Sequence, residues 1–477
     1  MVFSSLTFLC VFLPVVFLLY SIIPSMKFRN GLLIVASLAF YAYGEPVYVL
    51  LMIFSSLLNY FCARWVAANS QKMNRLALAV AVVVNLGILA AFKYSGFFVE
   101  SLNSVTGLSI PVPQIALPIG ISFFTFQALS YVIDVYRKNV SVQKNYFHVL
   151  LYITFFPQLI AGPIVKYRDI SEQIENRSQS VEKVAKGLRR FICGLAKKVL
   201  IANTMGSAAD AVFAAQGGEL SVVTAWLGAI AYLFQIYYDF SGYSDMAIGL
   251  GLMFGFEFKE NFNYPYGAAG IQDFWRKWHI SLSTWFKEYL YIPLGGNRKG
   301  KGKGRAAVNR VIVFFCTGLW HGASWTFVLW GLFHGAFMLL ETYVPAIKRL
   351  PRFVLHIYTL LVVTVGFVIF RADTISQGFE FIAKMFTGFD ISSASLSLAM
   401  TQLTPWFAVM LAVAVIGCAP IKPISRQLRY DAYEADGLSA LPRAIQAVLY
   451  VLALLLLVWC ILRLSGTSYN PFIYFRF

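Results

Sequence analysis

The sequence predicts an all-α protein with many membrane-spanning helices, and three observations lead to this fold class. Of the 477 residues, 59% are hydrophobic and only 13% are charged, which is more apolar surface than a water-soluble domain buries. Uncharged runs recur along the chain at the length that crosses about 30 Å of hydrocarbon. Lysines and arginines gather in the short connections between these runs. Helices are expected in the runs, because lipid satisfies no backbone hydrogen bond, and we expect about 11 spans.

The first apolar run, over residues 6–23, is expected to be a retained span. No basic residue precedes it and no small-residue cleavage site follows it, whereas a secretory signal has both. Lys27 and Arg29 mark the cytoplasmic side, because basic residues are enriched in cytoplasmic connections, and this places the N-terminus outside. Further spans are expected at residues 76–92, 221–238, 353–370 and 444–462, and the last of them brings the C-terminus outside.

Residues 146–165 interrupt the alternation of sides. Lys144 precedes this segment and Lys166 follows it, so both of its ends are assigned to the cytoplasm. Pro157 lies inside it, in the sequence FFPQLIAGPI, and a proline breaks a helix. We therefore expect a re-entrant, broken helix. Irregular backbone persists at membrane depth only where protein or a water-filled cavity surrounds it, which predicts an internal chamber.

Two basic segments are expected at the membrane surface. Residues 182–198 alternate basic and apolar side chains with helical spacing, which is typical of an amphipathic helix on an anionic inner surface. Residues 257–310 are strongly basic, and residues 273–296 within them mix aromatic rings with charges, which predicts an interfacial helix. The net charge of +17 is therefore assigned to topology and anionic lipid rather than to nucleic acid. No segment is suited to fold alone in water, so residues 1–477 are predicted to form a single membrane domain.

His321 is the leading candidate for chemistry. It lies in the apolar sequence FFCTGLWHGASW, and ionisable side chains inside a membrane are costly and often functional. Desolvation lowers the pKa of a histidine, which keeps the imidazole neutral and able to take a proton from a hydroxyl nucleophile. A neutral histidine that bridges two helices is the structural alternative. His279, in the segment 273–296, is expected either to join His321 in the chamber or to act as an interfacial anchor.

The remaining histidines and the cysteines are expected to be structural. His334 is predicted to make an interhelical hydrogen bond, and His148 and His356 are predicted to be interfacial. The six cysteines show neither CxxC spacing nor a disulfide pattern, so no metal site is predicted, and Cys316 is expected to be a packing residue. The glycine-rich residues 295–302 lack the serine or threonine of a P-loop and follow no strand, which excludes an NTPase.

An acyl donor such as acetyl coenzyme A would bring phosphate charges to the basic cytoplasmic segment, and no further cofactor is predicted. Arg276, Lys277 and Arg298 are the candidates to bind these phosphates; the alternative for each is that it only sets topology and attracts anionic lipid. The last eight residues, NPFIYFRF, are unusually apolar for a free end. They are expected to dock from the outer side, where Tyr474 is either structural or brings its hydroxyl to the chamber.

Several motifs together resemble the membrane-bound O-acyltransferase (MBOAT) family, and in particular bacterial alginate O-acetyltransferases. The resemblance covers nearly the whole chain. It rests on the sequences ALPIGISFFTFQALSYVIDVYR, FFPQLIAGPI, DFSGYSDMAIGLGLMFGF, NFNYPY, DFWRKWHISLSTWFKEYLYIPLGGNR, GLWHGASWTFVLWGLFHG and FRAD. It implies tilted helices and re-entrant elements around a central chamber with a pore across the membrane. It assigns the catalytic role to His321, in the WHG motif, and places the family's upstream histidine at His279, in WHISLS.

The resemblance also implies partners and a cellular place. Such proteins take an acyl group from a cytoplasmic donor and pass it outward, usually with an SGNH-hydrolase-like extracytoplasmic partner, onto a secreted or cell-wall polysaccharide. We therefore expect a multi-pass protein of the bacterial cytoplasmic membrane that acetylates an exopolysaccharide or wall glycan. Similar proteins transfer D-alanine to teichoic acid and use a partner with an aromatic, tyrosine-bearing end, which makes Tyr474 a candidate acyl relay. D-alanyl transfer and, from another class, a small-solute transporter or channel are the alternatives.

Overall fold

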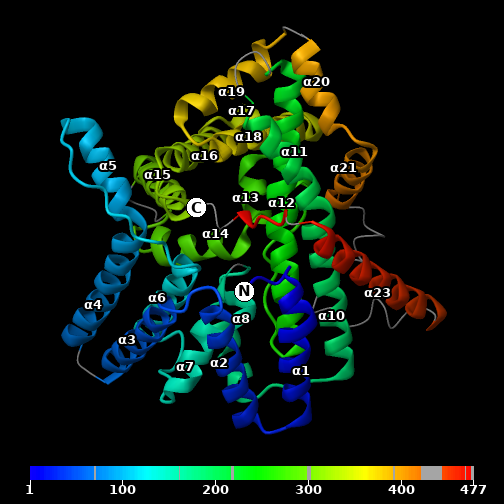
Figure 1. Cartoon of the computed structure of the whole chain (residues 1–477). Helices are drawn as coiled ribbons and strands as arrows, with labels where there is room; N and C mark the ends of the chain where they lie inside the picture. Colours follow the sequence, from blue (N-terminus) through cyan, green and yellow to red (C-terminus); the bar gives the residue numbers. More distant parts are fainter. Residues whose placement is uncertain are drawn as a thin grey trace. The chain divides into compact units, whose positions relative to one another are not determined.

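The regular structure of this chain is helical. The computed structural model describes residues 1–68, 71–160, 162–215, 220–297, 302–389, 393–419, 443–467 and 469–473, and within them it contains helices and no strand (Figure 1). The all-α prediction is therefore confirmed. The chain divides into two compact units, one made of Met1–Phe191 with Ser244–Lys259 and the other of Ile192–Tyr243 with Glu260–Phe477. The single domain over residues 1–477 stays a prediction.

Several helices are long and apolar enough to cross a membrane. In the described part of the chain, four helical stretches meet this test by length and composition, namely Tyr48–Ala68, Gln71–Thr106, Arg352–Arg371 and Ala447–Gly466. A fifth results if Leu396–Gln402 and Pro405–Cys418, which are bent by 73°, form one broken span. The multi-pass character fits these helices, whereas the expected number of about 11 spans is not confirmed. The first apolar run forms a shorter helix, Phe8–Ile22, and the run at 221–238 is part of a 32-residue helix.

The first unit is built mainly from α-helices of the N-terminal part of the chain. Its helices are α1 (Leu13–Ile22), α2 (Met26–Ala42), α3 (Tyr48–Ala68), α4 (Gln71–Leu89), α5 (Ser95–Thr106), α6 (Ile121–Tyr136), α7 (Tyr146–Thr154), α8 (Phe156–Leu159), α9 (Tyr167–Glu175) and most of α10 (Val181–Ala196). Helix α3 packs on both α4 and α6, and α2 packs on α7. The π-helical turns Phe8–Phe12 and Ala90–Tyr94 lead into α1 and join α4 to α5.

The broken helix predicted around Pro157 is present. Helix α7 ends at Thr154, Phe155 leaves the helical conformation, and Pro157 lies in the first turn of the short helix α8. Side chains from Val149 to Ile160 are buried in the protein, which is the environment that irregular backbone requires. The Tyr152 hydroxyl, for example, donates toward the carbonyl of Val165 at 3.0 Å. The side of the membrane at which this segment begins and ends stays a prediction.

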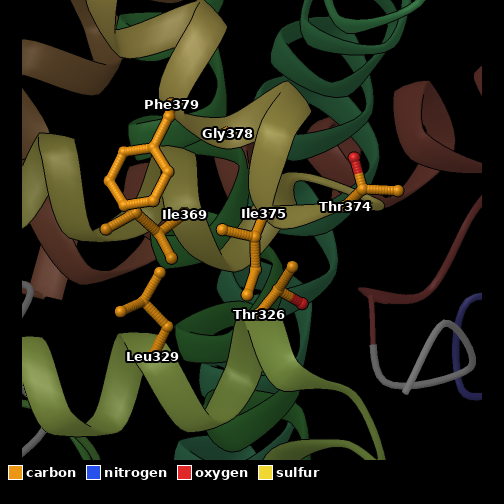
Figure 2. Close-up of a pocket in the computed structure, with 7 residues that line it drawn as sticks. All are labelled: Thr326, Leu329, Ile369, Thr374, Ile375, Gly378 and Phe379. Carbon is orange, nitrogen blue, oxygen red and sulfur yellow. The ribbon is translucent and has the colours of Figure 1, made fainter. Parts of the chain in front are cut away.

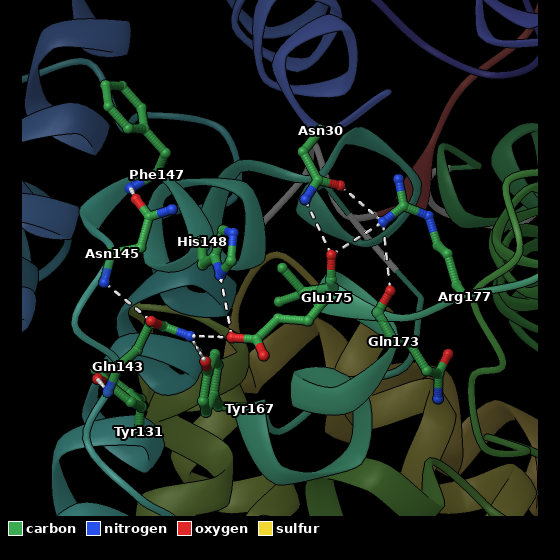
Figure 3. A network of polar contacts seen from close by, with 11 residues as sticks. Asn30, Tyr131, Gln143, Asn145, Phe147, His148, Tyr167, Gln173, Glu175 and Arg177 are labelled. Carbon is green, nitrogen blue, oxygen red and sulfur yellow. Dashed lines mark hydrogen bonds and ion pairs between the residues drawn. The ribbon is translucent and has the colours of Figure 1, made fainter. Parts of the chain in front are cut away.

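A network of polar contacts joins α7 and α9 to the preceding loop (Figure 3). Nε2 of Gln143 donates to the Tyr167 hydroxyl and to Glu175, each at 3.0 Å. Nδ1 of His148 lies 3.4 Å from the same Glu175 carboxylate. After α9, the buried guanidinium of Arg177 donates to Oδ1 of Asn30 at 2.7 Å. His148 is half-buried at the start of α7, and these contacts fix α9 in place.

Helix α10 has the predicted amphipathic sequence but a different environment. Arg189 and Arg190 are 9% and 8% exposed, and Arg190 pairs with Asp245 at 2.8 Å. A Cβ added at Gly187 would collide with the backbone at Gly249, so only glycine permits this close helix packing. The polar side of this helix therefore faces protein. Arg190 therefore pairs with a carboxylate of the protein rather than with anionic lipid, and the place of this helix on a membrane surface stays a prediction.

The second unit holds the C-terminal helices. Its helices are α11 (Asn203–Phe213), the first part of α12 (Val222–Met253), α13 (Ile271–Lys277), α14 (Ile280–Phe286), α15 (Gly302–His321), α16 (Trp325–Tyr343), α17 (Pro345–Lys348), α18 (Arg352–Arg371), α19 (Ile375–Thr387), α20 (Ser393–Gln402), α21 (Pro405–Cys418) and α23 (Arg443–Gly466). Shorter turns Lys197–Ala202, Pro265–Gly267 and Lys287–Tyr291 join them. Helices α15 and α16 form a tight pair, because a Cβ at Gly318 or Gly331 would collide with the backbone of the other helix.

The segment 273–296 differs from the single interfacial helix that its composition predicts. It forms two short helices, α13 and α14, that are interrupted at Trp278 and His279. His279 has φ 44° and ψ 56°, which is the left-handed conformation. Trp278 and His279 are buried, at 3% and 0% exposure, so they pack inside the protein. The aromatic residues that suggested a membrane interface serve here as core residues.

Candidate functional site

His321 lies at the C-terminal end of α15, where the chain turns sharply into α16. Ser324 begins α16, and its hydroxyl accepts a hydrogen bond from the backbone N–H of Thr326. Gly322 is required in the turn, because a Cβ there would overlap the ring of Phe327. The turn leaves the His321 side chain 7% exposed. It therefore fixes the imidazole inside the unit rather than at its surface.

Aromatic rings enclose the imidazole of His321. The ring centroids of Trp320 and Trp330 lie 5.0 Å from it, and that of Phe370 lies 5.4 Å from it. All three rings approach nearly edge to face, with interplanar angles of 77° to 85°. Three helices supply them, because Trp330 belongs to α16 and Phe370 to α18. These rings restrict the orientation of the imidazole and give it apolar surroundings.

His279 is brought to His321 from a distant part of the sequence. The two ring centroids are 6.5 Å apart, although the residues are 42 positions apart in the sequence. Phe240 of α12 packs edge-on against His279, with the centroids 4.5 Å apart. Of the two roles expected for His279, the structure therefore supports a place beside His321, and the role of interfacial anchor is wrong.

A small cavity opens beside His321. It is lined by Ile236, Phe240, Trp278, His321, Trp330, Phe367, Phe370 and Ile473. Seven of these eight residues are apolar or aromatic, so a reacting group there is largely shielded from water. Within this lining, His321 is the residue that can exchange a proton at neutral pH. This cavity is the candidate active site of the second unit.

Burial keeps His279 neutral. The side chain is fully buried, and this burial lowers its pKa well below the usual range, with a smaller contribution from the neighbouring His321. A histidine in this state carries a free electron pair on one ring nitrogen at neutral pH. His279 therefore has the protonation state that accepting a proton needs.

Glu341 of α16 fixes the short helix α13, which leads to His279. Its carboxylate is 4% exposed and accepts hydrogen bonds from the backbone N–H groups of Ile271 and Gln272, the latter at 3.0 Å. A negative charge at a helix N-terminus is favourable, because it meets unpaired N–H groups and the positive end of the helix dipole. Glu341 could not be identified from the sequence, since nothing in the linear order relates it to residues 70 positions earlier.

Replacing Glu341 with glutamine is expected to destabilise the protein by about 1–3 kcal/mol, because one of two buried N–H groups loses its acceptor. The measurement is thermal unfolding of the detergent-solubilised protein. Glu380, which is exposed on α19, provides the matched control, and Glu380→Gln is expected to change the unfolding temperature little. Equal unfolding temperatures for the two variants would contradict the role of Glu341.

The C-terminal segment docks beside the candidate active site, as predicted, in the described residues 470–473 of the last eight; the outer side of the membrane stays a prediction. Phe472 and Ile473 are buried, the Phe472 ring stacks on Tyr243 with centroids 4.3 Å apart, and Ile473 lines the cavity. The backbone N–H of Ile473 donates to Oδ2 of Asp239 at 2.9 Å. Asp239 pairs in turn with Lys198 at 2.8 Å, and Nζ of Lys198 also donates to the carbonyl of Pro471.

A second ion pair holds the start of this segment. The Tyr469 hydroxyl donates to Oδ2 of Asp210 at 2.7 Å, and Arg371 pairs with Oδ1 of the same carboxylate at 2.6 Å. Arg371 belongs to the FRAD motif, and it is 8% exposed at the end of α18. The FRAD and DFSGYSD motifs are visible in the sequence, but their contacts with the C-terminal segment are not. The sequence signal for such contacts is a charged residue, such as Arg371, within an apolar helix.

Of the three residues proposed to bind the donor, the structure describes Arg276 and Lys277. Arg276 is exposed on α13, and Lys277 pairs with Asp273 at 2.8 Å on the same helix. Arg298 and Tyr474 lie outside the residues that the structure describes. Among those residues, no group of three His, Cys, Asp or Glu side chains is placed to hold a metal ion. Donor binding by Arg276, Lys277 and Arg298 stays a prediction.

His334 differs from its expected role. It is fully buried, and neither ring nitrogen has a hydrogen-bond partner among the described residues, so the predicted interhelical hydrogen bond is wrong. Instead, its ring packs edge-on against Trp275 and Trp330, with centroids 5.3 and 5.2 Å away. His356 is half-buried, and its Nδ1 lies 3.1 Å from the carbonyl of Ala268. His334 contributes through packing, and His356 through a local hydrogen bond.

A second pocket of this unit carries no acid–base group. It lies between α16, α18 and α19 and is lined by Thr326, Leu329, Ile369, Thr374, Ile375, Gly378 and Phe379 (Figure 2). Its lining is apolar apart from two threonine hydroxyls. General acid–base chemistry is therefore not expected there, in contrast to the cavity beside His321.

Comparison with known proteins assigns the chain to a family. The family model described as MBOAT, the membrane-bound O-acyltransferase family, matches residues 33–372, a stretch that contains both His279 and His321. The chain belongs to the membrane-bound O-acyltransferase family. This MBOAT protein is therefore an O-acyltransferase and a membrane protein, as predicted, and the transporter alternative is set aside.

The names of individual relatives of this MBOAT protein give different substrates. It is 41% identical to a probable alginate O-acetylase of Pseudomonas putida, with full coverage of both chains. It is 36% identical to a peptidoglycan O-acetyltransferase of Helicobacter pylori, over 81% of this chain and 80% of the relative. A teichoic acid D-alanyltransferase of Bacillus subtilis is 29% identical over 53% of this chain and 67% of its own.

Proposed function

We propose that this MBOAT protein transfers acetyl groups from a cytoplasmic donor, acetyl coenzyme A, across the bacterial cytoplasmic membrane for the O-acetylation of a secreted or cell-wall polysaccharide. The single observation that carries the proposal is the buried pair of His279 and His321 beside an apolar cavity. The full-length similarity to a probable alginate O-acetylase supports the acetyl group and the polysaccharide acceptor. An SGNH-hydrolase-like extracytoplasmic partner, and N- and C-termini outside, are part of the same proposal.

The chemistry needs only proton transfer and shielding from water. His321 takes the proton of an acceptor hydroxyl, and the resulting oxygen nucleophile attacks the thioester carbonyl of the donor. A carbon–oxygen bond forms, the carbon–sulfur bond breaks, and the proton leaves with the coenzyme A sulfur as a thiol. His279 is the neighbouring group that shares this proton. The apolar cavity disfavours hydrolysis of the thioester, because it excludes water.

Tyr474 is proposed as an acyl relay. Ile473, the residue directly before it, lines the cavity that His321 lines. The hydroxyl of Tyr474 would accept the acetyl group from coenzyme A, and the ester would then pass to the outer acceptor with release of the tyrosine hydroxyl. The support for this role is the docking of residues 469–473, which holds the preceding backbone to Asp239.

The proposal is tested with the full-length protein in proteoliposomes that receive coenzyme A carrying a labelled acetyl group. We expect release of the free thiol and label on the protein that hydroxylamine removes, as an ester requires. His321→Ala should abolish both signals, and Tyr474→Phe should abolish the protein-bound label. His148→Asn, in the first unit, is the matched histidine control and should retain both. Labelling that survives His321→Ala would overturn the mechanism.

D-alanyl transfer to teichoic acid is the second candidate. Its support is the similarity to a teichoic acid D-alanyltransferase, which covers 53% of this chain, whereas the similarity to the alginate relative covers all of it. A parallel reaction with a D-alanyl thioester on a carrier protein separates the two. Label transfer from that carrier, but not from acetyl coenzyme A, would favour D-alanyl transfer.

A further inference from the structure

The backbone at His279 is held in a conformation that costs free energy. Residues other than glycine rarely adopt the left-handed region, and His279 lies there with φ 44°. Such a conformation persists only where surrounding contacts fix the chain. Asn261 supplies such a contact, since its backbone carbonyl accepts a hydrogen bond from the backbone N–H of Ile280 at 2.9 Å. Asn261 is itself fully buried.

The side chain of Asn261 also meets the histidine ring. One atom of its amide, Oδ1, lies 3.2 Å from the backbone N–H of Ser281, 2.8 Å from the Ser281 hydroxyl and 3.2 Å from Nδ1 of His279. A backbone N–H can only donate, so the amide atom that it contacts must be the oxygen and not the nitrogen. That oxygen can only accept a hydrogen bond. Nδ1 of His279 is therefore the donor and carries a proton.

A competing arrangement places the proton elsewhere. The Ser281 hydroxyl lies 3.4 Å from Nδ1 of His279 and could in principle donate to it, which would leave Nδ1 without a proton. The same hydroxyl lies 2.8 Å from Oδ1 of Asn261, a distance typical of a good O–H···O hydrogen bond. A hydroxyl has one proton to donate. The shorter contact takes it, and the proton of the ring stays on Nδ1.

We propose that Asn261 is a positioning residue, which fixes His279 in the tautomer protonated at Nδ1 and leaves the electron pair of Nε2 as the place where His279 accepts a proton. Nε2 is buried and has no hydrogen-bond partner among the described residues. A proton that reaches His279 adds to Nε2 and leaves from Nε2 to the coenzyme A thiolate, which becomes the free thiol, while the Nδ1–H bond to Asn261 is kept. The inference rests on the proposed function of His279 in acyl transfer.

The tautomer is measured directly by nitrogen NMR on the full-length protein in lipid, labelled at histidine. Only five histidines are present, and the signals of His279 are those that disappear in His279→Asn. We expect the proton on Nδ1 in the unaltered protein and in Asn261→Asp, which keeps an acceptor oxygen. Asn261→Ala should shift the proton wholly or partly to Nε2. Asn263→Ala, an exposed neighbour in the same segment, should leave the tautomer unchanged.

The rate of acetyl transfer gives the second measurement. Asn261→Ala should lower kcat roughly 10- to 100-fold with little change in KM for the donor, and Asn261→Asp should recover most of kcat. His279 protonated at Nε2 in the unaltered protein, or a tautomer that survives Asn261→Ala, would overturn the inference. Failure of the proposed function would show differently, as acetyl transfer that persists in His279→Asn while the tautomer is as expected.

Discussion

The substitution His321→Ala is expected to lower kcat for acetyl transfer by about 10²- to 10⁴-fold, the range that a positioned general base contributes. The imidazole is 7% exposed and lies between aromatic rings. Water from bulk solvent therefore does not replace it efficiently as the general base. The measurement is thiol release from acetyl coenzyme A in proteoliposomes. His356→Asn is the control from the same unit, because asparagine keeps a donor for the carbonyl of Ala268.

The double replacement at His321 and His279 sharpens this expectation. Groups that act as a unit lose activity together, so His279→Ala in the His321→Ala background should add little further loss. The 6.5 Å between the two ring centroids is close enough for such coupling. Two losses that multiply fully would show that the histidines act independently, contrary to the proposed sharing of a proton.

The substitution Lys198→Met is expected to destabilise the protein by about 3–5 kcal/mol, because it leaves the buried charge of Asp239 without its cation. Both side chains of this pair are 2% exposed. The same lysine also donates to the carbonyl of Pro471, so the C-terminal segment should detach and become sensitive to protease. Thermal unfolding in detergent and limited proteolysis from the C-terminus are the two measurements.

Two further variants make the Lys198 prediction specific. Lys198→Met combined with Asp239→Asn removes the buried charge but keeps an oxygen acceptor for the N–H of Ile473, and it should recover much of the lost stability. Lys186→Met breaks the pair with Glu182, whose side chain is 66% exposed, and should change the stability little. Equal losses in Lys198→Met and Lys186→Met would contradict a buried, structural role for Lys198.

Local patterns were reliable where a short stretch of sequence decides the outcome. The break at Pro157 was predictable, because a proline removes a backbone donor and crowds the preceding turn, which favours a kink or break in the helix. The docking of the apolar C-terminal segment was likewise predictable from its composition, although its anchors Lys198 and Asp210 were not. The contacts of the helix at residues 182–198 were not predictable, since amphipathic spacing gives a helix with a polar side but does not say whether lipid or a carboxylate such as Asp245 meets that side.

The sequence by itself determined that this is a helical membrane protein and an O-acyltransferase, and that His321 and His279 are its candidate catalytic residues. Composition and motif carry that information, because apolar content and residue order do not depend on how the helices pack. Only the tertiary structure decided that His279 leaves the helix, meets Asn261 and lies beside His321, and that Ile473 closes the same cavity. These contacts join residues far apart in the chain, and packing of whole helices, not local preference, sets such distances.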